Sequence, residues 1–160
     1  MKVGLVLKEL HQSETALYYQ LLQLSQRHIA EHEVHHVSRD IAQWSREHVA
    51  KIADTATSYG EELEPVIADR RASKHASVEH HDAALGQHNP AGLPLLWDLQ
   101  GIYMATSGIS AQWLMLSQAA QALQKSDLLT LVGDCKPRTQ QQMRWANAQI
   151  KQLSAQILVS

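Results

Sequence analysis

The sequence predicts an all-α protein, a four-helix bundle made of two antiparallel helical hairpins joined by a long crossover, in one domain spanning residues 1–160. Three observations support this fold class. Between Gly4 and Gly60 there is neither glycine nor proline, and apolar residues recur at the three- and four-residue spacing of a helix. Residues 60–92 interrupt the pattern with three glycines and two prolines. A second long helical pattern follows.

The first hairpin is expected to contain helices over residues 5–27 and 31–58. One uninterrupted helix of that length would be abnormal for a globular domain, so a tight turn is expected near residues 27–30. Gly60 is a suitable C-cap for the second helix. Residues 59–92 are interpreted as the crossover, which is long enough to run the ~30 Å length of a bundle.

The third helix is predicted over residues 93–124, with Pro94 in its first turn, where proline is favoured. Residues 99–124 carry no charged side chain. Their glutamines, serines and threonine would be costly in lipid, so we predict a buried central helix and no association with a membrane.

The fourth helix is predicted over residues 128–158, with Ser126 and Asp127 as its cap. Gly133 and Pro137 are expected to kink or interrupt its first turns, because proline removes a backbone donor and clashes with the preceding turn.

Composition narrows the classes of function. A net charge of −2 without any basic run argues against nucleic-acid binding. The lone Cys135 cannot form an internal disulfide, so nothing requires an oxidising compartment. The apolar run from Val3 to Leu7 is too short for the core of a signal peptide, and a cytoplasmic location is therefore expected.

Two polar residues interrupt the apolar stripes of the first hairpin. Glu14 stands where the spacing of the first helix calls for a hydrophobic residue, and His48 does so on the second. In a hairpin that turns near residue 30, Glu14 faces the segment from Ser45 to His48. A buried carboxylate must be paired, hydrogen-bonded, protonated or bound to metal, so these two residues form the main candidate site.

The segment from Trp44 to Ile52, which contains Arg46-Glu47-His48, resembles the second helix of ferritin-like proteins, where a Glu-x-x-His motif binds metal. The resemblance places His48 at the family's histidine ligand and Glu14 at its first-helix glutamate. It also places other residue types where the family has ligands. These are Ser45 at the bridging glutamate, Thr106 near the third-helix ligand, and Gln140, Gln141 and Gln142 near a fourth-helix carboxylate.

The second half of the chain has few acids to contribute, since no glutamate follows Glu79. Two metal ions need several anionic oxygens, whereas Glu14 and His48 supply one charge and one neutral nitrogen. We therefore interpret the chain as a non-catalytic bundle with a degenerate metal site, acting as a binding, structural or oligomerisation module without a cofactor. Glu14 and His48 would then form a hydrogen-bonded pair that specifies the packing.

The alternative is a metal-binding protein or metal-dependent oxidoreductase that uses Glu14 and His48, with Glu31 or His35 as a further ligand, to hold iron, manganese or zinc. Separately, His32 and His36 have the one-turn spacing that chelates transition metals, so adventitious metal binding is expected there. The histidines and acids of the crossover are interpreted as exposed loop residues. These are His75, Glu79, His80, His81, Asp82 and His88.

The third helix is the expected surface for a homo-oligomer, because it is uncharged and contains Trp113 beside a stripe of small residues, Gly101, Ala105 and Gly108. Two alternatives use the same helix. One is a partner protein, and the other is a small apolar ligand held beside the small residues.

Overall fold

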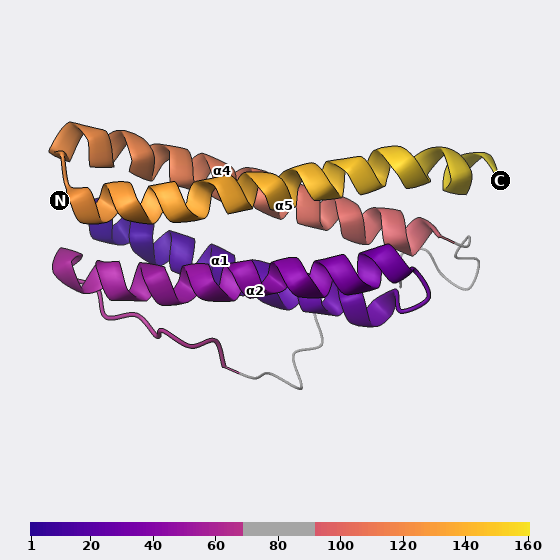
Figure 1. Cartoon of the computed structure of the whole chain (residues 1–160), viewed down its shortest axis with the longest axis horizontal. Helices are drawn as coiled ribbons and strands as arrows, with labels where there is room; N and C mark the ends of the chain where they lie inside the picture. Colours follow the sequence, from indigo (N-terminus) through magenta and orange to yellow (C-terminus); the bar gives the residue numbers. More distant parts are fainter. Residues whose placement is uncertain (69–91) are drawn as a thin grey trace.

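The computed structural model describes residues 1–68 and 92–160, and all regular secondary structure in these two ranges is helical. The bounds agree with the predicted ones to within about two residues at each end. The elements are α1 (Val3–Arg27), α2 (His32–Ala56), a single 3₁₀ turn η1 (Thr57–Tyr59), α4 (Leu93–Leu123) and α5 (Ser126–Val159) (Figure 1).

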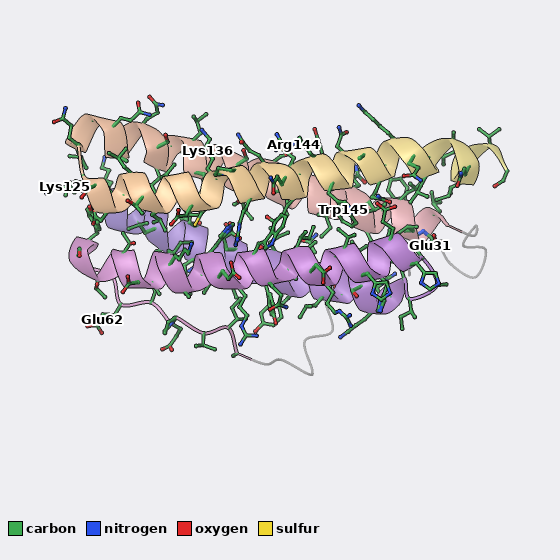
Figure 2. All side chains as sticks on the ribbon, viewed as in Figure 1. Glu31, Glu62, Lys125, Lys136, Arg144 and Trp145 are labelled. Carbon is green, nitrogen blue, oxygen red and sulfur yellow. The ribbon has the colours of Figure 1, made fainter. Side chains whose placement is uncertain are left out.

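The four long helices pack pairwise, with α1 against α2 and α4, and α5 against α4 and α2. The α1–α2 turn and the α4–α5 link lie at opposite ends of the bundle (Figure 1), as the positions of Glu31 and Lys125 also show (Figure 2). Neighbouring helices are therefore antiparallel, whereas α2 and α4 run in the same direction. This confirms an all-helical four-helix architecture.

The core consists of the predicted apolar stripes. On α1 the buried residues recur at steps of three and four, and Glu14 occupies one of these positions. Trp113 on α4 is completely buried, so the prediction that it contributes to an oligomer surface is wrong. None of the helices in the described ranges combines the length and apolar composition needed to cross a bilayer.

The course of α5 differs from the prediction. The helix runs without a break through Gly133 and Pro137, so the predicted interruption does not occur. Pro137 leaves the carbonyl of Gly133 without its usual donor, but Gly133 is exposed and water satisfies that carbonyl at little cost. The helix begins at Ser126, and Lys125 is the N-cap in place of the predicted Ser126 and Asp127.

The chain after α2 turns back along α1. Gly60 adopts a left-handed conformation with φ of 83° and is the C-cap of η1, the 3₁₀ turn that continues α2, whereas Thr57 is the C-cap of α2 itself. At Gly4 a Cβ atom would lie 2.6 Å from the Tyr59 carbonyl oxygen, so the close approach of the two segments requires glycine. Farther along, His11 Nε2 donates to the Glu64 carbonyl oxygen at 2.7 Å. The histidines and acids predicted for the crossover lie outside the described residues.

Candidate functional site

A layer of buried polar side chains crosses the middle of the bundle, and each of the four helices contributes to it. Its centre is Glu14 on α1, whose side chain is 0% exposed, and His48 on α2, at 1%. The neighbouring positions on the other helices are buried as well. In the following, the polar layer means Glu14, Ser45, His48, Thr106, Trp113, Thr139 and Gln142.

One oxygen of the Glu14 carboxylate contacts all three other helices. Oε1 accepts hydrogen bonds from His48 Nδ1 on α2 at 3.1 Å, from Trp113 Nε1 on α4 at 3.2 Å and from Thr139 Oγ1 on α5 at 3.4 Å. The imidazole and indole rings also meet edge to face, with centroids 6.1 Å apart. The carboxylate therefore links the two hairpins as well as the two helices of its own hairpin.

The positions that the resemblance compares with further metal ligands are occupied by neutral side chains that bind protein atoms. Gln142 Nε2 donates to the Ile41 carbonyl oxygen at 2.9 Å and to Ser45 Oγ at 3.0 Å. Thr106 Oγ1 donates to the Ile102 carbonyl oxygen of its own helix at 2.8 Å. The donor atoms of these groups are paired within the protein, and the groups add no negative charge.

Three buried atoms of the layer have no hydrogen-bond partner among the described residues: Glu14 Oε2, His48 Nε2 and Gln142 Oε1. The two central residues thus each use one polar atom within the protein and retain one for a further contact. A buried polar atom left without a partner typically costs about 1–3 kcal/mol.

The layer does not fit a pair of metal ions. In the described parts of the chain, no three histidine, cysteine or acidic side chains are arranged so that they could hold a metal ion. Glu14 and His48 provide two possible metal ligands, of which only Glu14 is an anionic carboxylate. One carboxylate supplies too little negative charge to offset two divalent ions.

The structure argues against the third ligand in the alternative in which Glu14 and His48 hold one metal ion together with Glu31 or His35. His35 lies thirteen residues before His48 on the same helix, a separation of about 20 Å at 1.5 Å per residue. Its Nδ1 atom lies 2.7 Å from the Ser25 carbonyl oxygen, at the α1–α2 turn. Glu31 precedes α2 at the same end of the bundle. The structure therefore does not bring His35 or Glu31 to the polar layer.

The pair His32 and His36 lies at the exposed start of α2, one turn apart as predicted. Their rings stack with centroids 6.1 Å apart and an interplanar angle of 17°. Both side chains are exposed, so the pair is separate from the polar layer.

Cys135 lies on α5, one turn before Thr139, and is fully buried. Burial raises the pKa of its thiol well above the usual range, and the negative charge of Glu14 raises it further. The thiol is therefore protonated at neutral pH and is a poor nucleophile.

Sequence reasoning found Glu14 and His48 but missed two of the donors that complete the site. Trp113 was interpreted as part of an oligomer surface, and Thr139 was not singled out. A signal for Trp113 existed, since a buried indole N–H needs an acceptor and Glu14 is the only acid on the apolar stripe of α1. A second missed contact is at the α1–α2 turn, where Asp98 Oδ2 accepts from His28 Nε2 at 2.7 Å and Arg27 Nε at 3.2 Å.

Comparison of the chain with protein-family models, with curated proteins and with solved structures gave no match. The resemblance to ferritin-like proteins therefore stays a prediction that rests on the residues of α1 and α2.

Proposed function

We propose that this protein is a non-catalytic four-helix bundle that acts as a binding, structural or oligomerisation module, built on a ferritin-like layer that has lost its di-iron site. The observation that carries the proposal is the environment of Glu14. A single carboxylate oxygen accepts from side chains on all three other helices, within 3.1–3.4 Å. Such a carboxylate fixes the relative positions of the helices.

The direction of the helices supports the ferritin-like part of the proposal. Because α2 and α4 run in the same direction (Figure 1), the two hairpins cannot be joined by a short turn. A bundle with one long crossover has this wiring. The buried free thiol of Cys135 supports the further proposal that the protein works in the cytoplasm.

The chemistry of the layer supports a structural role over catalysis. Apart from Glu14 and His48, its side chains are neutral: Thr106, Trp113, Thr139 and Gln142 each donate a hydrogen bond within the protein, and Ser45 accepts one from Gln142. A buried pair of this kind contributes little net stability, but removal of one partner is strongly destabilising. The pair therefore acts as a specificity element that disfavours other packings of the helices.

A specific observation favours a second candidate, a metal-binding protein. Glu14 Oε2 and His48 Nε2 are both buried and both lack a partner among the described residues. Carboxylate oxygen and imidazole nitrogen are ordinary ligands of iron, manganese and zinc.

Metal analysis separates the two candidates. The protein is purified without an affinity tag, and its metal content and melting temperature are compared with those of the Glu14→Ala/His48→Ala variant. The non-catalytic proposal expects metal far below one equivalent in both proteins and a lower melting temperature in the variant. One equivalent or more of iron, manganese or zinc that disappears in the variant would overturn it.

A matched control is needed because the exposed histidines of α2 are also expected to bind metal adventitiously. The variant His32→Ala/His36→Ala removes this pair and leaves the polar layer intact. Metal that is lost in this control but kept in the Glu14→Ala/His48→Ala variant comes from the surface pair and leaves the non-catalytic proposal standing.

A further inference from the structure

The surface of α4 that points away from the bundle carries no charge over its whole length. Seven exposed residues follow one another at steps of three and four, and none is acidic or basic. The apolar ones are strongly exposed, with Met104 at 65% and Met115 at 58%. In the following, the α4 outer face means Trp97, Gln100, Met104, Gly108, Ala111, Met115 and Gln118.

The outer sides of the neighbouring helices differ from this face. The exposed residues of α1 include Lys8 and Glu9, and those of α5 include Asp134 and Arg144, which are typical of helices in contact with water. A long exposed face that combines large apolar side chains with a complete lack of charge is typical of a surface covered by a protein partner.

We propose that a second copy of this chain covers the α4 outer face, with two α4 helices packed antiparallel about a two-fold axis at Gly108. The inference deepens the proposed function, since it rests on the bundle being an oligomerisation module and names its partner. A two-fold interface brings each residue of the patch against a residue of the same patch. A charged face would repel its own copy, whereas this one does not.

The order of side chains along α4 suits this register. With Gly108 on the axis, Met104 of each copy comes level with residue 112 of the other, next to Ala111, and Met115 comes level with residue 101, next to Gln100. Met104 thus meets the small side chain of Ala111, and nothing lies within 4 Å of the position that a Cβ atom of Gly108 would occupy. The two helices can therefore approach closely at the axis.

A groove beside the α4 outer face is better suited to a side chain of the second copy than to a free small molecule. It lies between α1 and α4, has uncharged walls that include Ala16, Met104 and Gln112, and has a volume of about 270 Å³. Pockets for small ligands usually hold about 300–1,000 Å³. Gln112 Oε1 is buried at this groove and has no hydrogen-bond partner among the described residues.

The size of the face sets the expected affinity. With 31 residues, α4 is about 46 Å long, and a contact strip ~10 Å wide gives about 460 Å² for each copy. The two copies together bury about 900 Å², below the ~1,200–2,000 Å² of stable interfaces. We therefore expect a weak dimer with a dissociation constant in the micromolar range.

Sedimentation velocity of the full chain over a range of about 1–200 μM tests the proposal, with the variant Gly108→Glu as the probe. Glutamate has room at this position and a better helix propensity than glycine, so the monomer stays folded. It places two like charges against each other on the axis, which should raise the dissociation constant by about tenfold or more.

The chain provides a matched control. Gly133 on α5 is also exposed with nothing within 4 Å of its Cβ position, so Gly133→Glu makes the same change in charge and helix propensity away from the α4 outer face. The proposal expects native protein and Gly133→Glu to dimerise alike and Gly108→Glu to be monomeric, with native circular dichroism in all three.

Two results would overturn the proposal. One is a native protein that stays monomeric up to 200 μM, which would leave the face to a different partner. The other is a dimer that Gly108→Glu does not weaken, which would place the interface elsewhere. Neither result bears on metal content, so failure of this inference is distinguishable from failure of the non-catalytic assignment.

Discussion

The two hairpins of this bundle contribute different chemistry to the same buried layer. The α1–α2 hairpin supplies a carboxylate and an imidazole, Glu14 and His48, which bind each other. The α4–α5 hairpin supplies only neutral groups, among which Trp113 and Thr139 donate to that carboxylate. The comparison shows how the second hairpin can satisfy a buried charge on the first without carrying any charge of its own.

This difference also distinguishes two functions that a buried polar layer can have in a helical bundle, the binding of metal ions and the positioning of helices. A two-metal site in a bundle needs charged ligands from all four helices, because the ions carry the positive charge that the ligands offset. Here one carboxylate is stabilised by an imidazole, an indole and a hydroxyl, and the charge is spread over hydrogen bonds. The layer is therefore suited to positioning helices, and variants on each hairpin should show that asymmetry.

The largest effect is expected on the charged side. His48→Leu leaves the Glu14 carboxylate buried without its imidazole partner and should lower the free energy of unfolding by about 3–5 kcal/mol. Urea unfolding measures the change. In the variant Glu14→Leu/His48→Leu both polar groups are gone, so most of the lost stability should return, since a buried pair is often replaceable by apolar residues.

The control for this prediction is Gln43→Leu, which lies on the same helix as His48 but is exposed. It should change the free energy of unfolding by no more than about 0.5 kcal/mol. If the double variant is less stable than His48→Leu, then Glu14 is held mainly by Trp113 and Thr139, and the imidazole is the lesser partner.

The sequence predicts the part of this site that lies on α1 and α2, the two helices joined by a short turn. Helical spacing identifies Glu14 and His48 as polar residues on apolar stripes, and a turn near residue 30 fixes which residues of α1 and α2 face each other. Trp113 and Thr139 were missed because their helices are separated from α1 by the crossover. Spacing within a helix does not fix its axial position against a helix so distant in the chain.

The wrong expectations have equally local causes. His35 was grouped with the site by residue type alone, but it lies about 20 Å along α2 from His48, and its ring contacts Ser25 at the bundle end. Pro137 was expected to kink or interrupt α5, but the interruption does not occur, because tertiary packing on both sides of it, through Cys135 and Thr139, outweighs the loss of one backbone hydrogen bond. Most of the predicted crossover over residues 59–92, namely residues 69–91, lies outside the described residues, and its predicted role stays a prediction.

A smaller loss of stability is expected from a substitution among the neutral residues that the α4–α5 hairpin contributes to the layer. Gln142→Glu replaces an amide that donates to the Ile41 carbonyl oxygen and Ser45 with a group that donates only when protonated. We expect a loss of about 2 kcal/mol in the free energy of unfolding. Gln141→Glu makes the same change at an exposed position and should be nearly neutral. Equal effects of the two variants would mean that the second hairpin tolerates a buried charge.

The smallest effect should come from Cys135, the thiol of the second hairpin, and it should depend on pH. Burial, followed by the nearby charge of Glu14, raises the pKa of this thiol above its ordinary value of 9.0. Its contribution to stability is therefore fully present below about pH 9 and is lost as the pH rises from there toward the raised pKa of the folded state, because the unfolded chain releases the proton first. Between native protein and Cys135→Ala, the difference in free energy of unfolding should change by about 1.4 kcal/mol from pH 8 to pH 10. A constant difference over this range would mean that the thiol ionises as readily in the folded protein as in the unfolded chain.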